Sequence, residues 1–576
     1  MQKKEKVIII GGISAGTSAA AKIRRLNEDI DIVIYERDKY ISYATCGLPY
    51  FISGKIPKLS NIIINSKELF SQRFNLTVNT LHDVLSINPK EKTIKVKNLK
   101  TNEIFTDNYD KLIIATGTSS IDLKETIFDA SNSFRLKTID DAIAIKNFLD
   151  ELEVVESESI DKSAVDYNFA EDIISTDVVI IGGGYISLEL LEAFTEKNLK
   201  VLIIEKESQL LSIFDKEIID YLENYLFKRE IIILKNDSVK EVRKNGNNII
   251  DLIVTENGKR ISTKLVFLGV GINVENSLLK DEGAELGVRG AIKTDELLKT
   301  NIPDIFAIGD CIEIKDLVSQ KFTNINLATT ATKEGRTVAY NIFGKNKPFK
   351  GSLGTTILKI FDIAIGKTGL SFKDAKKLYK NAVKIETHEP SHASYYPGYS
   401  IMHMVTIFDK DTGKILGFEA IGRDSIDKKV DVMATAMKGN LSITDLASCD
   451  YAYHPAFGAA KDPINLIGMV AENYLNKDID FINCEELKDK INNNEDFTLI
   501  DVRTQREYDF GHIENAILIT LDSIRDNLDK IDKNKLVVLY CRTGYRAYIA
   551  YRILKNNGFN NIVCLNGSYL SWIKEI

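Results

Sequence analysis

Two cysteines of this sequence stand in surroundings that could support chemistry. Cys46 lies in "ISYATCGLPYFISG", between aromatic residues and a Gly-Leu-Pro turn, and Cys541 follows the apolar run "LVVLY". No two of the six cysteines form a CxxC pair, so neither a zinc site nor a disulfide framework is expected. The remaining four are expected to be packing residues: Cys311, Cys449, Cys484 and Cys564.

The loop after Cys541 has features that could activate a thiol. Arg542 lies inside the loop, and four residues separate Cys541 from Arg546. The residues from Arg542 to Arg546 lead into a segment with a helical pattern. Backbone N–H groups at a helix start, together with arginine charge, would stabilise a thiolate and then an anionic persulfide. A tyrosine-phosphatase loop is one residue longer, and the shorter loop suits a single sulfur atom better than a phosphate. We therefore predict that Cys541 and Arg546 are catalytic.

The N-terminal segment has the pattern of a dinucleotide-binding unit. "KVIIIGGISAGTSAAAKIRRL" joins an apolar strand to Gly11, Gly12 and Gly16 and then to an Ala-rich helix, and the strand "DIVIYE" ends in Glu36. Glycines at such a turn let the backbone approach a pyrophosphate at the helix N-terminus, and the acid accepts a hydrogen bond from a ribose hydroxyl.

The same pattern recurs in "TDVVIIGGGYISLELLEAFTEKNLKVLIIE". Gly182 and Gly184 lie between strand and helix, and the second strand ends in Glu205. Because a carboxylate would repel a 2′-phosphate, Glu205 favours NADH over NADPH, although Lys206 beside it leaves NADPH open.

Length and charge limit the remaining possibilities. A chain of 576 residues is too long for one core and should form roughly three to five domains. The net charge of −7 gives no reason to expect binding to nucleic acid or an anionic membrane. Apolar runs such as "KVIIIGG" have the length of strands, so we expect a cytoplasmic protein with no membrane partner and no bound metal.

Two further segments accompany the dinucleotide units. "YDKLIIATGTSS" carries Ala115, Thr116 and Gly117, and "TNIPDIFAIGDCIE" carries Asp310 after a strand. Together the four segments resemble the pyridine nucleotide–disulfide oxidoreductase family. The resemblance implies that the first unit, the Ala-Thr-Gly segment and Asp310 bind FAD, and that the second unit binds the nicotinamide cofactor.

The resemblance also implies an α/β fold with four domains. These are an FAD-binding domain (residues 1–120 and 290–330), an NAD(P)H-binding domain (121–289), an α+β dimerisation domain (331–472) and a C-terminal α/β rhodanese domain (478–576). The first two would be Rossmann-like.

Around Cys46 the sequence resembles the single-cysteine branch of this family. The position five residues after Cys46 is Phe51, so no second thiol closes a redox disulfide. Oxidases and peroxidases of the branch carry a histidine in the first glycine loop, where this chain has Ser14. "SHASYYPGYS" and "CDYAYHPAFGAAKDP" resemble coenzyme A–disulfide reductase segments, which implies that Tyr395 and Tyr453 reach across a dimer interface to the cysteine.

Three residues match coenzyme A contact positions of that branch: Lys22, Arg25 and Ser42. A further lysine of the family is replaced here by Phe74. Lys22 and Arg25 could equally form the solvated face of the first helix.

The last hundred residues resemble a rhodanese domain. "FTLIDVRTQREYDFGHIENAI" reads as a strand, "KLVVLYCRTGYRA" as a strand leading into a helix, and "NIVCLNG" as a further strand. Four residues of the family's scaffold motif are expected to be structural: Asp501, Arg503, Glu507 and His512.

The whole chain thus resembles fused coenzyme A–disulfide reductase/rhodanese enzymes. This implies a homodimer in which electrons pass from NADH through FAD to a mixed disulfide of Cys46 and coenzyme A. The Cys46 thiolate would then attack a coenzyme A persulfide or polysulfide and release hydrosulfide, while Cys541 delivers sulfane sulfur.

Three alternatives remain open. The first is reduction of coenzyme A disulfide beside an independent sulfurtransferase, and the second is an NADH oxidase or peroxidase that cycles Cys46 through sulfenic acid. The third is a redox-sensing protein whose rhodanese domain binds a partner, which only the acidic insertion near residues 151–175 favours.

Overall fold

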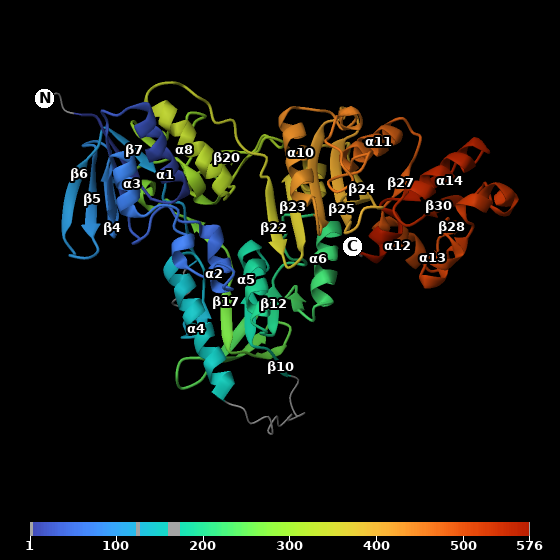
Figure 1. Cartoon of the computed structure of the whole chain (residues 1–576), viewed down its shortest axis with the longest axis horizontal. Helices are drawn as coiled ribbons and strands as arrows, with labels where there is room; N and C mark the ends of the chain where they lie inside the picture. The colour runs from blue at the N-terminus through green and yellow to red at the C-terminus, as the bar shows by residue number, and fades with distance from the viewer. Residues whose placement is uncertain (1–3, 122–126, 159–172, 575–576) are drawn as a thin grey trace. The chain divides into compact units, whose positions relative to one another are not determined.

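The computed structural model describes residues 4–121, 127–158 and 173–574 (Figure 1). The chain forms two compact units, Met1–Leu210 with Ile231–Gly354, and Leu211–Glu230 with Thr355–Ile576. The acidic insertion begins within a long helix, α4 (Ile139–Glu158), and its residues 159–172 lie outside the described part of the chain.

The first unit is built around a parallel sheet of five strands in the order β19-β7-β1-β2-β3. Their bounds are β1 (Lys6–Ile10), β2 (Asp31–Glu36), β3 (Thr77–Thr80), β7 (Lys111–Ile114) and β19 (Ile305–Ala307). The central strand β1 is apolar along most of its length, as expected for a strand covered on both faces. Ile10 pairs with both Tyr35 and Ile114, so the loops that follow β1, β2 and β7 leave the sheet at one edge.

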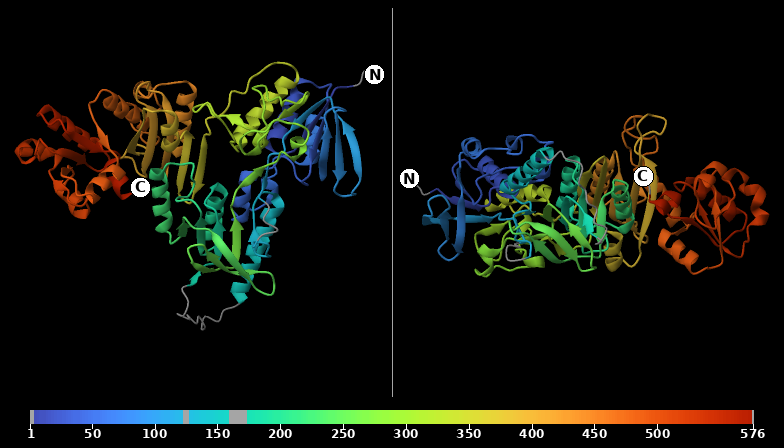
Figure 2. Two further views of the ribbon diagram at one scale, coloured as in Figure 1. Left: turned by 180° about the vertical axis from the view of Figure 1, so that it is seen from behind. Right: turned by 90° about the horizontal axis from the view of Figure 1, so that it is seen from below.

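Two helices of this unit, α1 (Ser14–Leu26) and α8 (Ala328–Ile342), lie side by side (Figure 1). The close approach depends on Gly335, where a Cβ atom would lie only 2.6 Å from the carbonyl oxygen of Ala15. Helix α3 (Lys67–Phe74) also packs against α1. A three-stranded antiparallel sheet in blue in Figure 2 comprises β4 (His82–Asn88), β5 (Thr93–Asn98) and β6 (Ile104–Asn108).

A second parallel sheet in the same unit has the order β13-β12-β11-β17-β9. Its strands are β9 (Ser133–Phe134), β11 (Val178–Ile181), β12 (Val201–Glu205), β13 (Ile232–Lys235) and β17 (Leu265–Leu268), and α5 (Tyr185–Glu196) joins β11 to β12. A four-stranded sheet beside it contains β10 (Ile173–Ser175), β14 (Val239–Lys244), β15 (Ile250–Thr255) and β16 (Arg260–Ser262). Two βαβ units therefore occur in the first unit of the chain, as the glycine patterns predict.

The second unit begins with an antiparallel sheet in the order β22-β23-β26-β25-β24. Its strands are β22 (Thr356–Ile360), β23 (Ile363–Gly369), β24 (Ala382–Pro390), β25 (Ile401–Asp409) and β26 (Ile415–Gly422). Its helices are α6 (Lys216–Phe227), α9 (Phe372–Leu378), α10 (Ile426–Lys438) and α11 (Pro463–Leu475).

The C-terminal part of this unit is a parallel sheet in the order β27-β31-β30-β28-β29. Its strands are β27 (Phe481–Ile482), β28 (Phe497–Asp501), β29 (Ile517–Leu518), β30 (Leu536–Tyr540) and β31 (Ile562–Leu565), and its helices are α12 (Cys484–Asn492), α13 (Gln505–Phe510), α14 (Tyr545–Asn556) and α15 (Ser568–Ile573). Alternate residues of β30 enter two apolar clusters, one under α14 and one under α12, so helices cover both faces of the sheet. The predicted fold class is confirmed.

One predicted strand is too long. The segment "FTLIDVRTQREYDFGHIENAI" is extended only to Asp501, because Thr504 and Glu507 form a capping box that starts α13. In the described part of the chain, no helix has the length and apolar character needed to cross a membrane.

Candidate active site

The first glycine turn is a tight cradle that only glycine can form. Gly11 has φ of +107°, and a Cβ atom there would lie 2.2 Å from the carbonyl oxygen of Ala115. At Gly16 a Cβ atom would lie 1.9 Å from the carbonyl oxygen of Gly11. The structure therefore brings the Ala115-Thr116-Gly117 segment against the predicted pyrophosphate turn.

Glu36 stands at the end of β2 with its carboxylate directed at this turn. Its Oε2 accepts a hydrogen bond from the backbone N–H of Gly12 at 2.7 Å, and its Oε1 accepts one from the N–H of Asp38 at 2.9 Å. Burial raises the pKa of the Glu36 carboxyl. A glycine turn that offers backbone N–H groups to a pyrophosphate, with an acid beside it that accepts from a ribose hydroxyl, is what the adenosine half of FAD requires. These residues therefore fit the cofactor.

Asp310 lies in the turn that follows β19 and is partly buried. Its neighbour Gly309 has φ of +79° and approaches Ala15 so closely that a Cβ atom would lie 3.0 Å from the Ala15 side chain. Burial raises the pKa of Asp310, and the nearby charge of Lys137 opposes that shift. The structure thus places Asp310 next to the start of α1, with the other predicted FAD residues.

The second glycine turn repeats this geometry. Gly182 has φ of +96°, and a Cβ atom there would lie 2.5 Å from the carbonyl oxygen of Gly269. The backbone N–H of Gly183 donates to Glu205 Oε2 at 2.5 Å, and Gly184 leads into α5. A cradle with an acceptor at the end of β12 fits a dinucleotide with a free 2′-hydroxyl.

Cys46 is an exposed free thiol in a short 3₁₀ helix (Thr45–Gly47) that leads into helix α2 (Leu48–Ile52). The loop before it is tied to the first glycine turn, because the N–H of Ser42 donates to the carbonyl oxygen of Gly12 at 2.9 Å. Ser42 itself has φ of +48°, a conformation that is uncommon for residues other than glycine and often marks functional loops. The backbone therefore joins the Cys46 loop to the FAD cradle.

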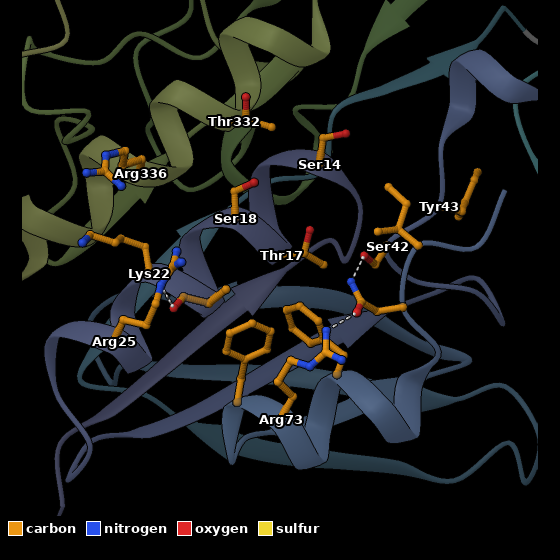
Figure 3. A pocket seen from close by; sticks show the side chains of 15 residues that line it. Ser14, Thr17, Ser18, Lys22, Arg25, Ser42, Tyr43, Arg73, Thr332 and Arg336 are labelled. Atoms are coloured by element: carbon orange, nitrogen blue, oxygen red, sulfur yellow. Dashed lines mark hydrogen bonds between the residues drawn. The ribbon is translucent and has the colours of Figure 1, made fainter. Parts of the chain in front are cut away.

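A pocket of about 430 Å³ opens between α1, α3, α8 and this loop (Figure 3). Lys22, Arg25 and Ser42 all line it, so the three predicted coenzyme A contacts share one wall. The remaining lining residues are Ser14, Thr17, Ser18, Ala21, Tyr43, Ile64, Asn65, Phe70, Arg73, Phe74, Thr332 and Arg336.

Two lining arginines are absent from the sequence prediction. Arg73 stands next to Phe74 and donates to Asn65 Oδ1 at 3.3 Å, while Asn65 donates to Ser42 Oγ at 3.2 Å. Arg336 enters from α8 (Figure 3). Arg73 directly precedes Phe74, the position at which the family has a lysine, so the sequence did show a positive charge there. No local signal in the sequence pointed to Arg336.

The pocket is therefore strongly cationic in a chain with a net negative charge. Among the described residues that line it, four carry a positive charge and none is a carboxylate. Such a site attracts a ligand with several negative charges.

The two predicted active-site tyrosines lie together in the second unit. Tyr395 Oη and Tyr453 Oη are 2.9 Å apart, and their side chains are 75% and 50% exposed. The hydrogen bond between the two phenols raises the pKa of Tyr395. Paired phenols on a surface can donate protons to a group that approaches from outside the chain.

Cys541 is 1% exposed and sits at the end of β30. The N–H of Gly544 donates to its sulfur at 3.1 Å, and its own N–H donates to Ser568 Oγ at 2.9 Å. Arg546 forms two hydrogen bonds to Glu507, at 2.8 and 2.6 Å, and this arginine lowers the pKa of Glu507 to about 2. Glu507, expected to be structural, thus orients the predicted catalytic arginine.

Comparison with known families identifies the chain. Residues 5–335 match the family described as pyridine nucleotide-disulphide oxidoreductase, which is more than half of the 576 residues. The chain belongs to this family. Residues 355–462 match the dimerisation domain of pyridine nucleotide-disulphide oxidoreductases, and residues 483–575 match a rhodanese-like domain. The predicted family and enzyme class are confirmed.

Individual relatives agree with this assignment. The oxidoreductase is 32% identical over 469 residues to coenzyme A disulfide reductase of Staphylococcus aureus (strain JH9), covering 81% of this chain and 100% of the relative. The structure of reduced Bacillus anthracis CoADR-RHD is similar with a TM-score of 0.92 and 34% identity, covering 99% of this chain and 98% of the other. An NAD-dependent persulfide reductase from A. fulgidus gives a TM-score of 0.88 and 29% identity, covering 98% and 100%.

Proposed function

We propose that this oxidoreductase uses NADH and FAD to reduce coenzyme A persulfide, polysulfide and coenzyme A disulfide through Cys46, with release of hydrogen sulfide from the sulfane substrates. The observation that carries the proposal is a cationic pocket lined by Lys22, Arg25, Arg73 and Arg336. Ser42 and Tyr43, which precede the exposed Cys46 thiol in the same loop, also line it. Coenzyme A combines several phosphate charges with a long neutral arm that ends in sulfur, which suits this pocket. The relatives named above support the substrate class.

Cys46 acts as a lone nucleophile in this proposal. Its thiolate attacks the coenzyme A sulfur of a persulfide, forms a Cys46–coenzyme A disulfide and expels HS⁻. Reduction of that disulfide to coenzyme A thiol and Cys46 thiolate consumes two electrons and one proton. The glycine cradles at Gly11 and Gly182 would hold FAD and NADH, which would supply these electrons.

The working protein is proposed to be a homodimer in the cytoplasm. Tyr395 and Tyr453 are exposed within the segment that matches a dimerisation domain, and their hydroxyl groups share a hydrogen bond. Tyr395 of the partner subunit and Tyr453 of the partner subunit would donate protons to the departing sulfide or thiolate at Cys46.

Cys541 is proposed to carry incoming sulfane sulfur. The N–H of Gly544 already donates to its sulfur, and the charge of Arg546 lies nearby to stabilise an anionic persulfide. From Cys541 the sulfur passes to coenzyme A or to Cys46.

The test is anaerobic NADH oxidation measured together with sulfide release. Coenzyme A persulfide, polysulfide, coenzyme A disulfide and hydrogen peroxide are offered in parallel to the wild type, Cys46→Ser and Cys541→Ser. We expect turnover with the sulfane substrates that is lost in Cys46→Ser, and a selective loss of polysulfide use in Cys541→Ser. Turnover with peroxide alone would show a sulfenic acid cycle at Cys46 and would refute the proposal.

A further inference from the structure

Two histidines are stacked face to face inside the second unit, where β24 and β25 meet the C-terminal helix α15. His388 and His403 are register partners on the two strands, and their ring centroids lie 4.5 Å apart with an angle of 8° between the planes. Both residues are buried, with 1% and 0% of their surface exposed. The chemistry proposed at Cys46 and at Cys541 uses neither of them.

Hydrogen bonds to α15 determine which nitrogen of His388 carries a proton. The hydroxyl group of Ser571 donates to Glu386 Oε2 at 2.8 Å, so its oxygen is left to accept from His388 Nε2, which lies 2.9 Å away. The hydroxyl group of Tyr221 donates to the carbonyl oxygen of Leu570 at 2.7 Å, and its oxygen lies 3.3 Å from the same nitrogen. His388 Nε2 therefore carries a proton and donates it toward α15 and α6.

The second ring nitrogen of His388 could not hold a proton at low cost. Among the described residues, the buried Nδ1 atoms of His388 and His403 have no hydrogen-bond partner. His403 Nε2 lies 3.2 Å from Glu386 Oε2, so a positive charge on His403 would be balanced by a carboxylate. A proton on His388 Nδ1 would instead create a buried charge with an unsatisfied N–H group.

The surrounding charges also oppose protonation of His388. Burial lowers the pKa of His388 well below its ordinary value of 6.5, and the charges of His403 and Arg542 lower it further. Burial acts to raise the pKa of Glu386, but its interactions with His403 and Lys384 lower that pKa overall, so Glu386 is ionised at neutral pH. The titratable and charged groups around the pair are Lys384 and Glu386 on β24, His403 on β25, Asp220 and Tyr221 on α6, Cys484 on α12, Arg542 after Cys541, and Lys574 after α15.

Separation of α15 from the sheet would give His388 access to water. Its pKa would then return to about 6.5, so the open form would take up a proton that the closed form excludes. The closed form has its full advantage above pH 6.5. Below this pH, the ratio of closed to open molecules falls by up to about ten-fold for each pH unit.

We propose that the stacked pair of His388 and His403 is a pH-sensitive joint, which holds α15 on the antiparallel sheet at neutral pH and releases it in acid. The N–H of Tyr569 donates to the carbonyl oxygen of Cys541 at 3.0 Å, and the N–H of Leu570 donates to that of Arg542 at 3.1 Å. Release of α15 would therefore also loosen the sulfur-carrying loop. The opening itself does not depend on the proposed function, whereas its consequence, slower delivery of sulfane sulfur in acid, rests on it.

Hydrogen exchange in the flavin-loaded full chain measures the opening. We expect the protection of α15 amides, relative to an unstructured peptide at the same pH, to fall about ten-fold per pH unit between pH 6.5 and 5. His388→Gln keeps an N–H donor but cannot titrate, so this fall should be absent. His512→Gln removes an exposed histidine of the rhodanese domain and should behave like the wild type.

A neighbouring carboxyl group acts in the opposite direction. Glu389 lies on the other face of β24, and burial raises its pKa to about 7, so it stabilises the fold more in acid than at alkaline pH. Because Glu389 is present in both proteins, the difference between the wild type and His388→Gln isolates the effect of His388.

Equal protection of α15 at pH 7 and pH 5 in the wild type would overturn the inference, even if His388→Gln did not fold. A fall of the same size in His388→Gln would overturn it as well. In kinetics, polysulfide turnover of the wild type should decrease in acid relative to coenzyme A disulfide turnover, and this decrease should be smaller in His388→Gln. Loss of protection without any change in that ratio would refute the proposed sulfur delivery by Cys541 and leave the joint standing.

Discussion

Glu334 is a carboxyl group that α8 buries against the turn before Asp310. Its side chain is 1% exposed and accepts a hydrogen bond from the N–H of Gly309 at 2.6 Å. Burial raises the pKa of Glu334 to about 8, and the charge of Asp310 adds a smaller upward shift. The residue is therefore largely protonated at neutral pH in the folded protein.

This pKa predicts a pH dependence of stability. The folded protein holds a proton on Glu334 that the unfolded chain releases near the ordinary carboxyl pKa of 4.5. The stabilising contribution is therefore complete below pH 4.5 and is lost as the pH rises to about 8. Relative to Glu334→Gln, the free energy of unfolding of the flavin-loaded wild type should fall over this window by at most about 1.4 kcal/mol per pH unit. Denaturant unfolding from pH 5 to 9 measures it.

The control for this prediction is Glu285→Gln, which changes an exposed carboxylate. Its unfolding free energy should follow that of the wild type at every pH. If the Glu334→Gln curve were also parallel to the wild type, Glu334 would be ionised in the folded protein and the interpretation would be wrong.

At the scale of elements, the contact between α1 and α8 determines how the pocket is assembled. Gly335→Ala would place a Cβ atom 2.6 Å from the Ala15 carbonyl oxygen and 2.9 Å from the Ser18 Cβ, so one helix must move. We expect a loss of about 1–3 kcal/mol in unfolding free energy and a higher KM for coenzyme A disulfide. Gly246→Ala, at a position with nothing within 4 Å, is the matched control for thermal unfolding and kinetics. An unchanged KM in Gly335→Ala would show that the pocket does not depend on this contact.

Local patterns in the sequence predicted the elements that are fixed by neighbouring residues. The glycine turns after β1 and β11 could be predicted because tight turns, helix starts and terminal acids follow one another within about thirty residues. The strand expected beyond Asp501 was wrong because the capping box of Thr504 and Glu507 competes locally with extension.

The pocket could be predicted only in part. Lys22, Arg25 and Ser42 came from a resemblance to a known family, and the structure places all three in one wall. Arg73 and Arg336 come from segments that are remote in the sequence, so only the packing of α3 and α8 against α1 brings them together. The burial of Cys541 likewise depends on α14 and on the loop that leads to α15, which no local pattern describes.

At the scale of the whole molecule, the rhodanese domain is attached to the antiparallel sheet of its own unit by buried polar contacts. Ser571 in α15 donates to Glu386 Oε2 at 2.8 Å and lies 2.9 Å from His388 Nε2. Asn566 accepts from the N–H of Glu386 at 2.9 Å, and Tyr221 donates to the carbonyl oxygen of Leu570 at 2.7 Å. Because α15 also forms hydrogen bonds to the loop of Cys541, these contacts link the antiparallel sheet to that loop.

Ser571→Ala should weaken this attachment. The change leaves Glu386 and His388 each without one buried partner, which costs about 1–3 kcal/mol. We expect faster hydrogen exchange in α15 and in the loop after Cys541, and lower polysulfide turnover with unchanged turnover of coenzyme A disulfide. Ser523→Ala, whose hydroxyl bonds only within its own turn, is the control. Exchange rates like those of the wild type in Ser571→Ala would show that apolar packing alone holds the domain.

The six thiols of the chain differ in how far solvent reaches them. Cys46 is exposed, Cys449 and Cys484 are intermediate, and Cys311, Cys541 and Cys564 are buried. We therefore expect a bulky maleimide to react with Cys46 first and to leave Cys541 unmodified. Modification of the buried Cys541 thiol should require a small electrophile. The thiols of Cys46 and Cys541 should thus react at opposite ends of a titration of the unaltered protein, with Cys449 and Cys484 between them.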